Sequence, residues 1–479
     1  MKSVSLKKYS RFVKQKNYSM AIHHPPTPSA MVTVHQPHQL IMLIYPTASN
    51  KATNFTRCVS LIIVLLVSDG LLADPLIALK GGQIIDGISD QPLSENVILV
   101  QGNRILKIGD ESIIPDTATI MDLGNSTLLP GFIDCHAHPL MYADDYQTAH
   151  LSGSSAYKAL KGLKSMQNLL GAGWTTMRVM GDADVFYANQ DIRRVIEEGL
   201  FQGPRITGAA HYLSITGGGG DVNYLSPEQN VIPDGLVVNG PEEIRRAIRN
   251  EVKYGSDWIK LLVTGAFLSV GDSPRNVHFS AEELKVATEE AARLDVPVAA
   301  HAHATEGIRL AVEAGVRSIE HGTYLDEETM ELMSERGTFL VPTIYIGDML
   351  VEESSDIREK AVNDDYYNNY RHIFLDLVYK AHKKGVKVAV GTDLGGYNYD
   401  PKISAREMKV LVEAGMTPME AIMAGTRVGA ELLRWDDKLG TLKAGMLADI
   451  IAVPGKPLEN MSLLEQVIFV MKDGEVAKR

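Results

Sequence analysis

The chain has 479 residues, of which 45% are hydrophobic and 22% are charged, and its formal net charge is −12. This length suits a large globular domain with a smaller companion, because single cores stop growing near ~250–300 residues. Residues 1–57 carry eight Lys or Arg and no acidic residue, so the remaining 39 basic and 59 acidic residues give −20. That acidic excess argues against a nucleic-acid partner.

The first 73 residues predict a secretion signal behind a doubtful extension. Residues 58–73 form a short apolar run that follows Lys51 and Arg57 and ends in small residues. The run is too short to span a bilayer, which takes ~20 apolar residues, and it is typical of a signal peptide. A retained membrane anchor and a buried segment are the alternatives. We expect export to the periplasm or medium, with no stable membrane span after processing, or a cytoplasmic protein if the segment is not used. Residues 1–57 are a doubtful extension, because Met42 would be a more ordinary start.

Short β-like segments near both chain ends predict a small β-domain. Alternating apolar residues separated by glycines and by Asn or Asp appear in IALKGGQIIDG and NVILVQGNRILKIG, from Ile77 onward. The pattern returns near the C-terminus in GTLKAGMLADIIAVPG and LLEQVIFVMKDGEV. Such runs are typical of antiparallel strands joined by turns. We therefore expect residues 77–130 and 440–479 to pair into one small β-sandwich.

Between these ends, residues 131–439 alternate short apolar strands with amphipathic helices. The strand candidates are TTMRVM, RITGA, WIKLLV, PVAAHAH, SIEHG, TFLVP and VKVAVGTD, and the run before His136 completes eight βα units. Helical spacing appears between them, as in SAEELKVATEEAARL, where Ser280 and Glu283 predict a capping box. The pattern predicts an α/β protein with a (β/α)8 TIM-like barrel rather than a doubly wound sheet.

Ligand-type residues recur at the predicted strand ends, which is where barrel proteins place their functional groups. The first strand ends in Asp134, His136 and His138, which share parity and so face the same side. The two imidazoles could reach one cation, with Asp134 supporting them. A His-x-His pair by itself is a weak signal, because it also arises by accident where a strand ends.

Lys260 interrupts an apolar strand in DWIKLLVTG. A buried lysine is costly unless it is paired or neutralised. An internal ion pair is the commoner solution. The alternative is a neutral amine that has added CO2 to become a carbamate, whose two oxygens can bridge two cations.

Later strand ends strengthen the metal hypothesis. VAAHAHATEG contributes His301 and His303, SIEHGTYLD contributes His321, and VKVAVGTDLGG contributes Asp393. A single strand-end histidine is more often a hydrogen-bonded structural residue than a ligand. Several of them, together with an aspartate and a buried lysine, suit zinc or another divalent metal.

With these residues in place, the sequence resembles the amidohydrolase superfamily, in the branch of imidazolonepropionase-like and prolidase-like metal-dependent dipeptidases. The resemblance runs from about Ile77 to the C-terminus and rests, in order, on LPGFIDCHAHP, WIKLLVTGAFLS, FSAEELKVATEEAARLDVPVAAHAH, SIEHGTYLD, GTDLGG and EAGMTPMEAIMAGT. It implies a centre of two divalent ions, zinc in this family. The implied ligands are His136, His138, Lys260 as a CO2-derived carbamate, His301, His321 and Asp393.

The resemblance also suggests a mechanism. A hydroxide bridging the two metals would attack the amide carbonyl, and Asp393 would pass its proton to the leaving nitrogen. His303 and Tyr324 are candidates for binding the substrate carboxylate or the oxyanion, with loop packing as the alternative for Tyr324. Arg178 is expected in an internal ion pair. Two segments depart from the family pattern: Gly219, in TGGGGD, replaces an expected histidine, and LGGYNYD replaces a loop that is often aromatic or His-containing.

The preferred function is hydrolysis of a small-molecule substrate, either a dipeptide (Xaa-Pro or other Xaa-Xaa) or an N-acyl amino acid. An alternative keeps the metal centre for a cyclic amide, a lactone or a phosphotriester, because loops decide what reaches such a centre. A third hypothesis is a non-catalytic relative that uses the barrel as a binding or assembly module. A homo-oligomer is compatible with each of these.

Overall fold

A computed structural model describes residues 74–141, 146–267, 269–353, 365–395 and 399–479. The predicted extension 1–57 and the signal-like segment 58–73 lie outside the described residues. Within the described residues, no helix has the length and apolar character needed to cross a membrane.

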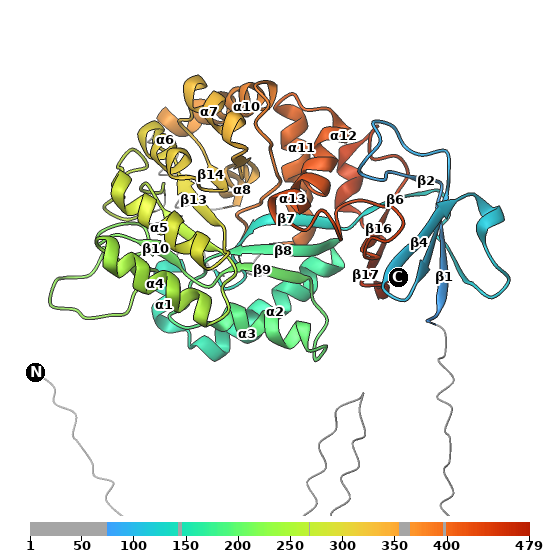
Figure 1. The fold of residues 1–479 in the computed structure, drawn as a ribbon, viewed down its shortest axis with the longest axis horizontal. Helices are drawn as coiled ribbons and strands as arrows, with labels where there is room; N and C mark the ends of the chain where they lie inside the picture. Colours follow the sequence, from blue (N-terminus) through green and yellow to red (C-terminus); the bar gives the residue numbers. More distant parts are fainter. Residues whose placement is uncertain (1–73, 142–145, 268, 354–364, 396–398) are drawn as a thin grey trace, which may run out of the picture. The chain divides into compact units, whose positions relative to one another are not determined.

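Strands from both ends of the described chain form two neighbouring sheets, with strand orders β4-β3-β1-β5 and β18-β17-β16-β6-β2. Their bounds are β1 (Leu76–Lys80), β2 (Gln83–Ile84), β3 (Val97–Gln101), β4 (Arg104–Gly109), β5 (Thr119–Asp122), β6 (Ser126–Pro130), β16 (Ile450–Pro454), β17 (Phe469–Lys472) and β18 (Glu475–Lys478). β6 and β16 pair antiparallel and lie side by side in Figure 1, although more than 300 residues separate them in the chain. The pairings β1–β5 and β2–β6 are parallel, so these sheets are mixed rather than wholly antiparallel.

The alternation within β3 explains how the two sheets pack. Ile98 and Val100 face a buried cluster that also contains Leu128 and Phe469 from the other sheet. Val97 and Leu99 face the opposite side and a second cluster. The continuous apolar run of β3 therefore reflects burial on both faces of this sheet, because successive side chains of a strand point to opposite faces.

Parallel strands occupy the middle of the chain, in the orders β7-β8-β9 and β11-β10-β12-β13-β14-β15. Their bounds are β7 (Phe132–Ala137), β8 (Trp174–Met180), β9 (Arg205–Ala209), β10 (Tyr212–Ser214), β11 (Leu236–Val237), β12 (Ile259–Leu262), β13 (Val298–Ala302), β14 (Ser318–His321) and β15 (Phe339–Val341). The predicted eighth strand, 386–393, is not a regular strand. It accepts backbone hydrogen bonds from Leu340 on β15 and from Cys135 on β7, so it links the two sheets. The arrangement is consistent with a TIM-barrel-type fold.

Helices separate these strands in sequence and lie outside them in Figure 1, which gives the protein its α/β character. Their bounds are α1 (Tyr146–Ser152), α2 (Ser155–Gly171), α3 (Ala188–Glu197), α4 (Pro241–Lys253), α5 (Ala281–Arg293), α6 (Thr305–Ala314), α7 (Glu327–Arg336), α8 (Tyr345–Glu353), α10 (Asp365–Lys383), α11 (Arg406–Glu413), α12 (Pro418–Ala424) and α13 (Arg427–Leu432), with short 3-10 turns η1 (Glu111–Ile113), η2 (Pro401–Ala405) and η3 (Met461–Glu465). The capping box predicted at Ser280 and Glu283 is confirmed at the start of α5.

Gly208 on β9 illustrates how closely the parallel strands approach. Its φ is +134°, and a Cβ at this position would lie 1.9 Å from the carbonyl oxygen of Val179 on β8. A side chain would therefore collide with backbone that cannot move without disturbing the sheet.

Candidate metal centre

His136 and His138 lie at the end of β7, and their rings are in contact. Their ring centroids are 5.1 Å apart. The Nδ1 atom of His136 donates to Glu320 Oε2 at 2.7 Å, and Nδ1 of His138 donates to the Gly181 carbonyl at 2.6 Å. These bonds leave both Nε2 atoms with a lone pair for a cation, which is the usual way in which a neighbouring group orients a histidine ligand.

Asp134 joins β7 to the segment that carries Asp393. Its Oδ1 accepts from the backbone N–H groups of His136 and Thr392 at 2.9 and 3.0 Å, and its Oδ2 accepts from Thr392 Oγ1 at 2.6 Å. Burial raises the pKa of Asp134 to about 6, against the opposing effect of these hydrogen bonds. Asp134 therefore supports the site by linking β7 to the segment that carries Asp393. The part that Thr392 plays in this contact was not recognised from the sequence.

Asp393 lies between the histidines of different strands. Its Oδ1 is 3.4 Å from His136 Nε2 and 3.0 Å from His138 Nε2, and its Oδ2 is 3.9 Å from His321 Nδ1. Burial by itself would raise the pKa of Asp393, but the adjacent histidines lower it. His321 and Asp393 both have positive φ, +70° and +55°. Non-glycine residues seldom adopt this conformation, and such backbone strain gathers at functional sites.

Lys260 points from β12 toward the same place, with its Nζ 3.3 Å from His136 Nε2. Only 2% of the residue is exposed, and burial lowers the pKa of its amine to about 8. Among the described residues, no carboxylate lies within ion-pair distance of this amine. The internal ion pair considered for Lys260 is therefore not the arrangement found there.

Arg178 does form the expected internal ion pair, and its partner is Glu320. The guanidinium is fully buried, donates to both oxygens of Glu320 at 2.8 and 3.0 Å, and stacks over the Trp258 ring at 4.5 Å. The same carboxylate accepts from His136, and although burial alone would raise the pKa of Glu320, Arg178 holds it well below its ordinary range. Sequence reasoning missed Glu320. Its signal was a charged residue inside the apolar strand SIEHG, one position before His321.

Three histidines from β13 and β14 complete the cluster. The rings of His301 and His321 are 4.7 Å apart, and His303 lies 4.6 Å from the former and 5.0 Å from the latter. Burial lowers the pKa of His301 and His321 well below the usual value, and that of His303 to about 3. All three are therefore neutral at physiological pH, which is the form that binds metals.

Hydroxyl groups on the following loops hold two of these rings. His303 Nδ1 is 2.7 Å from Thr323 Oγ1, and His321 Nδ1 is 2.7 Å from Thr343 Oγ1. Tyr324 follows directly, and its backbone N–H donates to the His303 carbonyl at 2.9 Å. The two residues proposed for substrate binding, His303 and Tyr324, are thus adjacent.

Gly219, which stands where the family resemblance suggests a histidine, faces Ser269. A Cβ at Gly219 would lie 2.7 Å from Ser269 Oγ and 3.4 Å from Leu262 Cδ1. Leu262 is the last residue of β12, so Gly219 lies near the C-terminal end of that strand. Ser269 therefore takes up space that a side chain at position 219 would need.

The residues present fit divalent metal ions. His136, His321 and Asp393 each offer a ligand atom, and these atoms lie within 4.8 Å of one another. The cluster combines neutral imidazoles, a carboxylate and a buried amine, and nitrogen and oxygen donors of this kind suit zinc and related cations.

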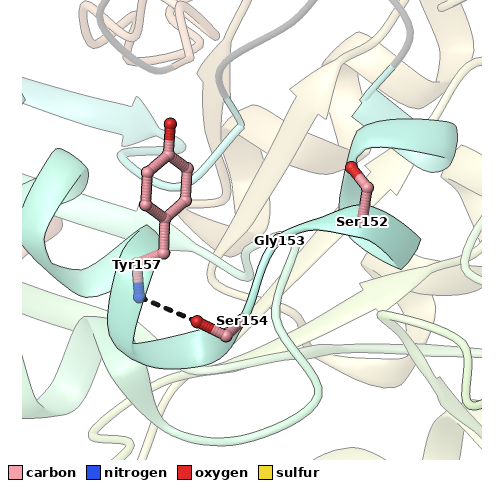
Figure 2. A pocket seen from close by; sticks show the side chains of 4 residues that line it. All are labelled: Ser152, Gly153, Ser154 and Tyr157. Atoms are coloured by element: carbon pink, nitrogen blue, oxygen red, sulfur yellow. Dashed lines mark hydrogen bonds between the residues drawn. The ribbon is translucent and has the colours of Figure 1, made fainter. Parts of the chain in front are cut away.

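A surface pocket at the junction of α1 and α2 is a separate feature. Ser152, Gly153, Ser154 and Tyr157 line it, and the dashed line in Figure 2 marks the bond from the Tyr157 N–H to Ser154 Oγ, 3.3 Å long. That bond caps the start of α2. The pocket contains none of the predicted site residues.

Comparison with known proteins identifies the family. The model of the amidohydrolase family matches residues 127–477. Ochratoxinase from Aspergillus niger is 33% identical, over 83% of this chain and 85% of its own. Imidazolonepropionase from Nocardia farcinica is 25% identical, over 79% and 92%. A solved Xaa-Pro dipeptidase with methionine bound in its active site is 36% identical, with a TM-score of 0.76 over 84% of this chain and 99% of that one. This chain belongs to the amidohydrolase family, in the branch that includes prolidase-like dipeptidases and imidazolonepropionase.

Proposed function

We propose that this chain is a binuclear metal-dependent hydrolase that cleaves the amide bond of dipeptides, Xaa-Pro or other Xaa-Xaa, or of N-acyl amino acids. The observation that carries the proposal is the position of Asp393, whose carboxylate lies against histidines from two different strands and beside Lys260. We further propose that the parallel strands form the (β/α)8 barrel that presents these groups at one end.

The proposed ligands lie in one cluster in which each side chain contacts another member. They are His136, His138, Lys260 as its carbamate, His301, His321 and Asp393. Zinc bound there would polarise the amide carbonyl and lower the pKa of water toward ~7. Formation of the carbamate requires the neutral Lys260 amine to attack CO2 through Nζ and to release one proton, and the lowered pKa of this amine favours that step.

Asp393 is suited to move the proton in the reaction. Its lowered pKa keeps it ionised near neutral pH. With 25% of its side chain exposed, it is also more accessible than His136 or His138. It would accept the proton of the attacking water and deliver it to the leaving nitrogen. His303 and Tyr324, on the next loops, would bind the substrate carboxylate or stabilise the oxyanion.

The ligands of two solved relatives support a substrate that contains an amino acid. The solved Xaa-Pro dipeptidase holds an amino acid, methionine, in its active site, and another solved relative is a prolidase complexed with N-methylphosphonate-L-proline. Gly219 with Ser269, and the segment after Asp393, are the places where we expect this chain to differ from such relatives in side-chain preference.

The test is a panel of dipeptides and N-acyl amino acids, supplied to zinc-loaded protein with bicarbonate present. Release of free amino acid by the wild type and none by Asp393→Asn would support the proposal. If no compound of the panel is hydrolysed but a lactone, a cyclic amide or a phosphotriester is, the proposed substrate class is wrong and that other class takes its place. Metal analysis tests the non-catalytic alternative, which fewer than two divalent ions per chain and an unmodified Lys260 would favour.

A further inference from the structure

The segments that follow the parallel strands carry an unusual distribution of charge. Among the described residues, those that lead from each strand toward the next helix are 139–141, 181–187, 215–240, 263–267, 269–280, 303–304, 322–326, 342–344, 394–395 and 399–400. Together these described residues contain eight Asp or Glu and one Lys or Arg, which is Arg275. A substrate anion at this end of the strands would be repelled by the acidic residues of most of these segments. Within the described segments, Arg275 is the one arginine or lysine with which it could pair.

Arg275 lies close to the candidate site. Its guanidinium carbon is 4.0 Å from the centroid of the Tyr324 ring, and the backbone of Tyr324 is hydrogen-bonded to His303. The chain after β12 folds back on itself, because Thr264 and Val277 form an antiparallel bridge. This return places Arg275 over the residues that follow the histidines of β13 and β14.

A second contact connects the same segment to the site. Phe267 lies a few residues before Arg275 in sequence, and its ring centroid is 4.7 Å from that of His303. Asp272 and His278 are paired at 3.0 Å with about 4% of each side chain exposed. The segment therefore contacts site residues through Phe267 and Arg275, and the buried pair of Asp272 with His278 stabilises its fold.

The guanidinium of Arg275 has no carboxylate within ion-pair distance among the residues that the structure describes. The residue is exposed, and stacking on Tyr324 orients the plane of the guanidinium without using its N–H groups. Those groups stay available for a carboxylate, which an arginine can bind through two parallel hydrogen bonds.

We infer that Arg275, held on the Tyr324 ring, binds the free carboxylate of the substrate, so that of the two roles proposed for His303 and Tyr324 the stabilisation of the oxyanion is the one that remains for them. This assignment rests on the proposed function and deepens it, because it makes the enzyme selective for substrates that end in a carboxylate. The stacked pair at the rim supplies the positive charge that the other loops lack.

The experiment compares the best substrate of the panel with its C-terminal carboxamide, in which the charge is removed. Arg275→Met keeps an unbranched, flexible side chain and removes the guanidinium with its charge. We expect it to lower kcat/KM for the acid by about 10- to 100-fold, mainly through KM, because a hydrogen-bonded ion pair of this kind is worth that factor. Activity on the carboxamide should change little. Arg275→Lys should restore part of the preference for the acid.

Arg246→Met is the matched control, since its side chain is 74% exposed on α4 and is loosely paired with Glu243 at 3.9 Å. It should leave both substrates unaffected. An unchanged ratio of acid to carboxamide in Arg275→Met, with an active wild type, would overturn the role of Arg275 and leave the proposed function standing. A wild type that cleaves no acid in the panel would overturn both. Calorimetric binding of the amino-acid product gives a second measurement, and its Kd should rise in Arg275→Met by a similar factor.

Discussion

Carboxylation of Lys260 should follow the neutral fraction of its amine, and this makes the proposed carbamate testable by pH. Only the neutral amine has the electron pair that attacks CO2. The 2% exposure of Lys260 lowers its pKa to about 8, because a buried ammonium loses hydration that the surrounding groups replace only in part. An ordinary exposed lysine has a pKa of about 10.4.

The two pKa values predict different dependences of the rate of carbamate formation on pH. With a pKa of about 8, the neutral fraction is roughly 3% near pH 6.5, roughly 75% near pH 8.5 and roughly 97% near pH 9.5. The carbamate should thus form about 25-fold faster near pH 8.5 than near pH 6.5, with little further gain above. An ordinary lysine would instead gain about tenfold for each pH unit over the whole range.

The assay is reconstitution of chelator-treated protein with zinc, at a fixed concentration of dissolved CO2, followed by 13C NMR of the carbamate carbon and by activity. Lys260→Ala should show no carbamate signal at any pH. A tenfold increase in rate between about pH 8.5 and 9.5 would refute the argument that burial lowers this pKa. Full activity in CO2-free buffer, with no 13C signal, would refute the carbamate itself.

Three further changes test other parts of the molecule. Asp393→Asn should abolish turnover while the protein retains metal, as measured by kinetics and metal analysis on one sample; near-normal turnover would contradict its proton-transfer role. Arg178→Met should destabilise metal-free protein by about 3–5 kcal/mol in urea denaturation, because it leaves buried Glu320 without its counter-charge; a loss under about 1 kcal/mol would mean that Glu320 is neutral there. Gly208→Ala should lower the free energy of unfolding by about 1–3 kcal/mol, measured by thermal denaturation, because its Cβ would overlap the Val179 carbonyl. Unchanged stability would show that β8 and β9 can move apart to admit the methyl group.

Local patterns in the sequence were sufficient for several features. The short apolar run of β3, the capping box at Ser280 and the shared parity of His136 and His138 each depend on residues a few positions apart. Such spacings are set by backbone geometry, which repeats every 2.0 residues in a strand and every 3.6 in a helix. The ordered motifs that begin with LPGFIDCHAHP also determined the family.

Other features depend on residues that are distant in the chain. Glu320 joins His136, 184 positions away, to Arg178, 142 positions away, and no local period records which buried carboxylate will meet which base. The eighth strand was expected to be regular, yet 386–393 makes only partial strand contacts. What the sequence by itself determined was the family and the kind of groups at the strand ends. Tertiary structure alone decided that Lys260 faces His136, with no carboxylate partner in the described part of the chain, and that Arg275 stacks on Tyr324. Both features depend on how separate loops and strands pack against each other.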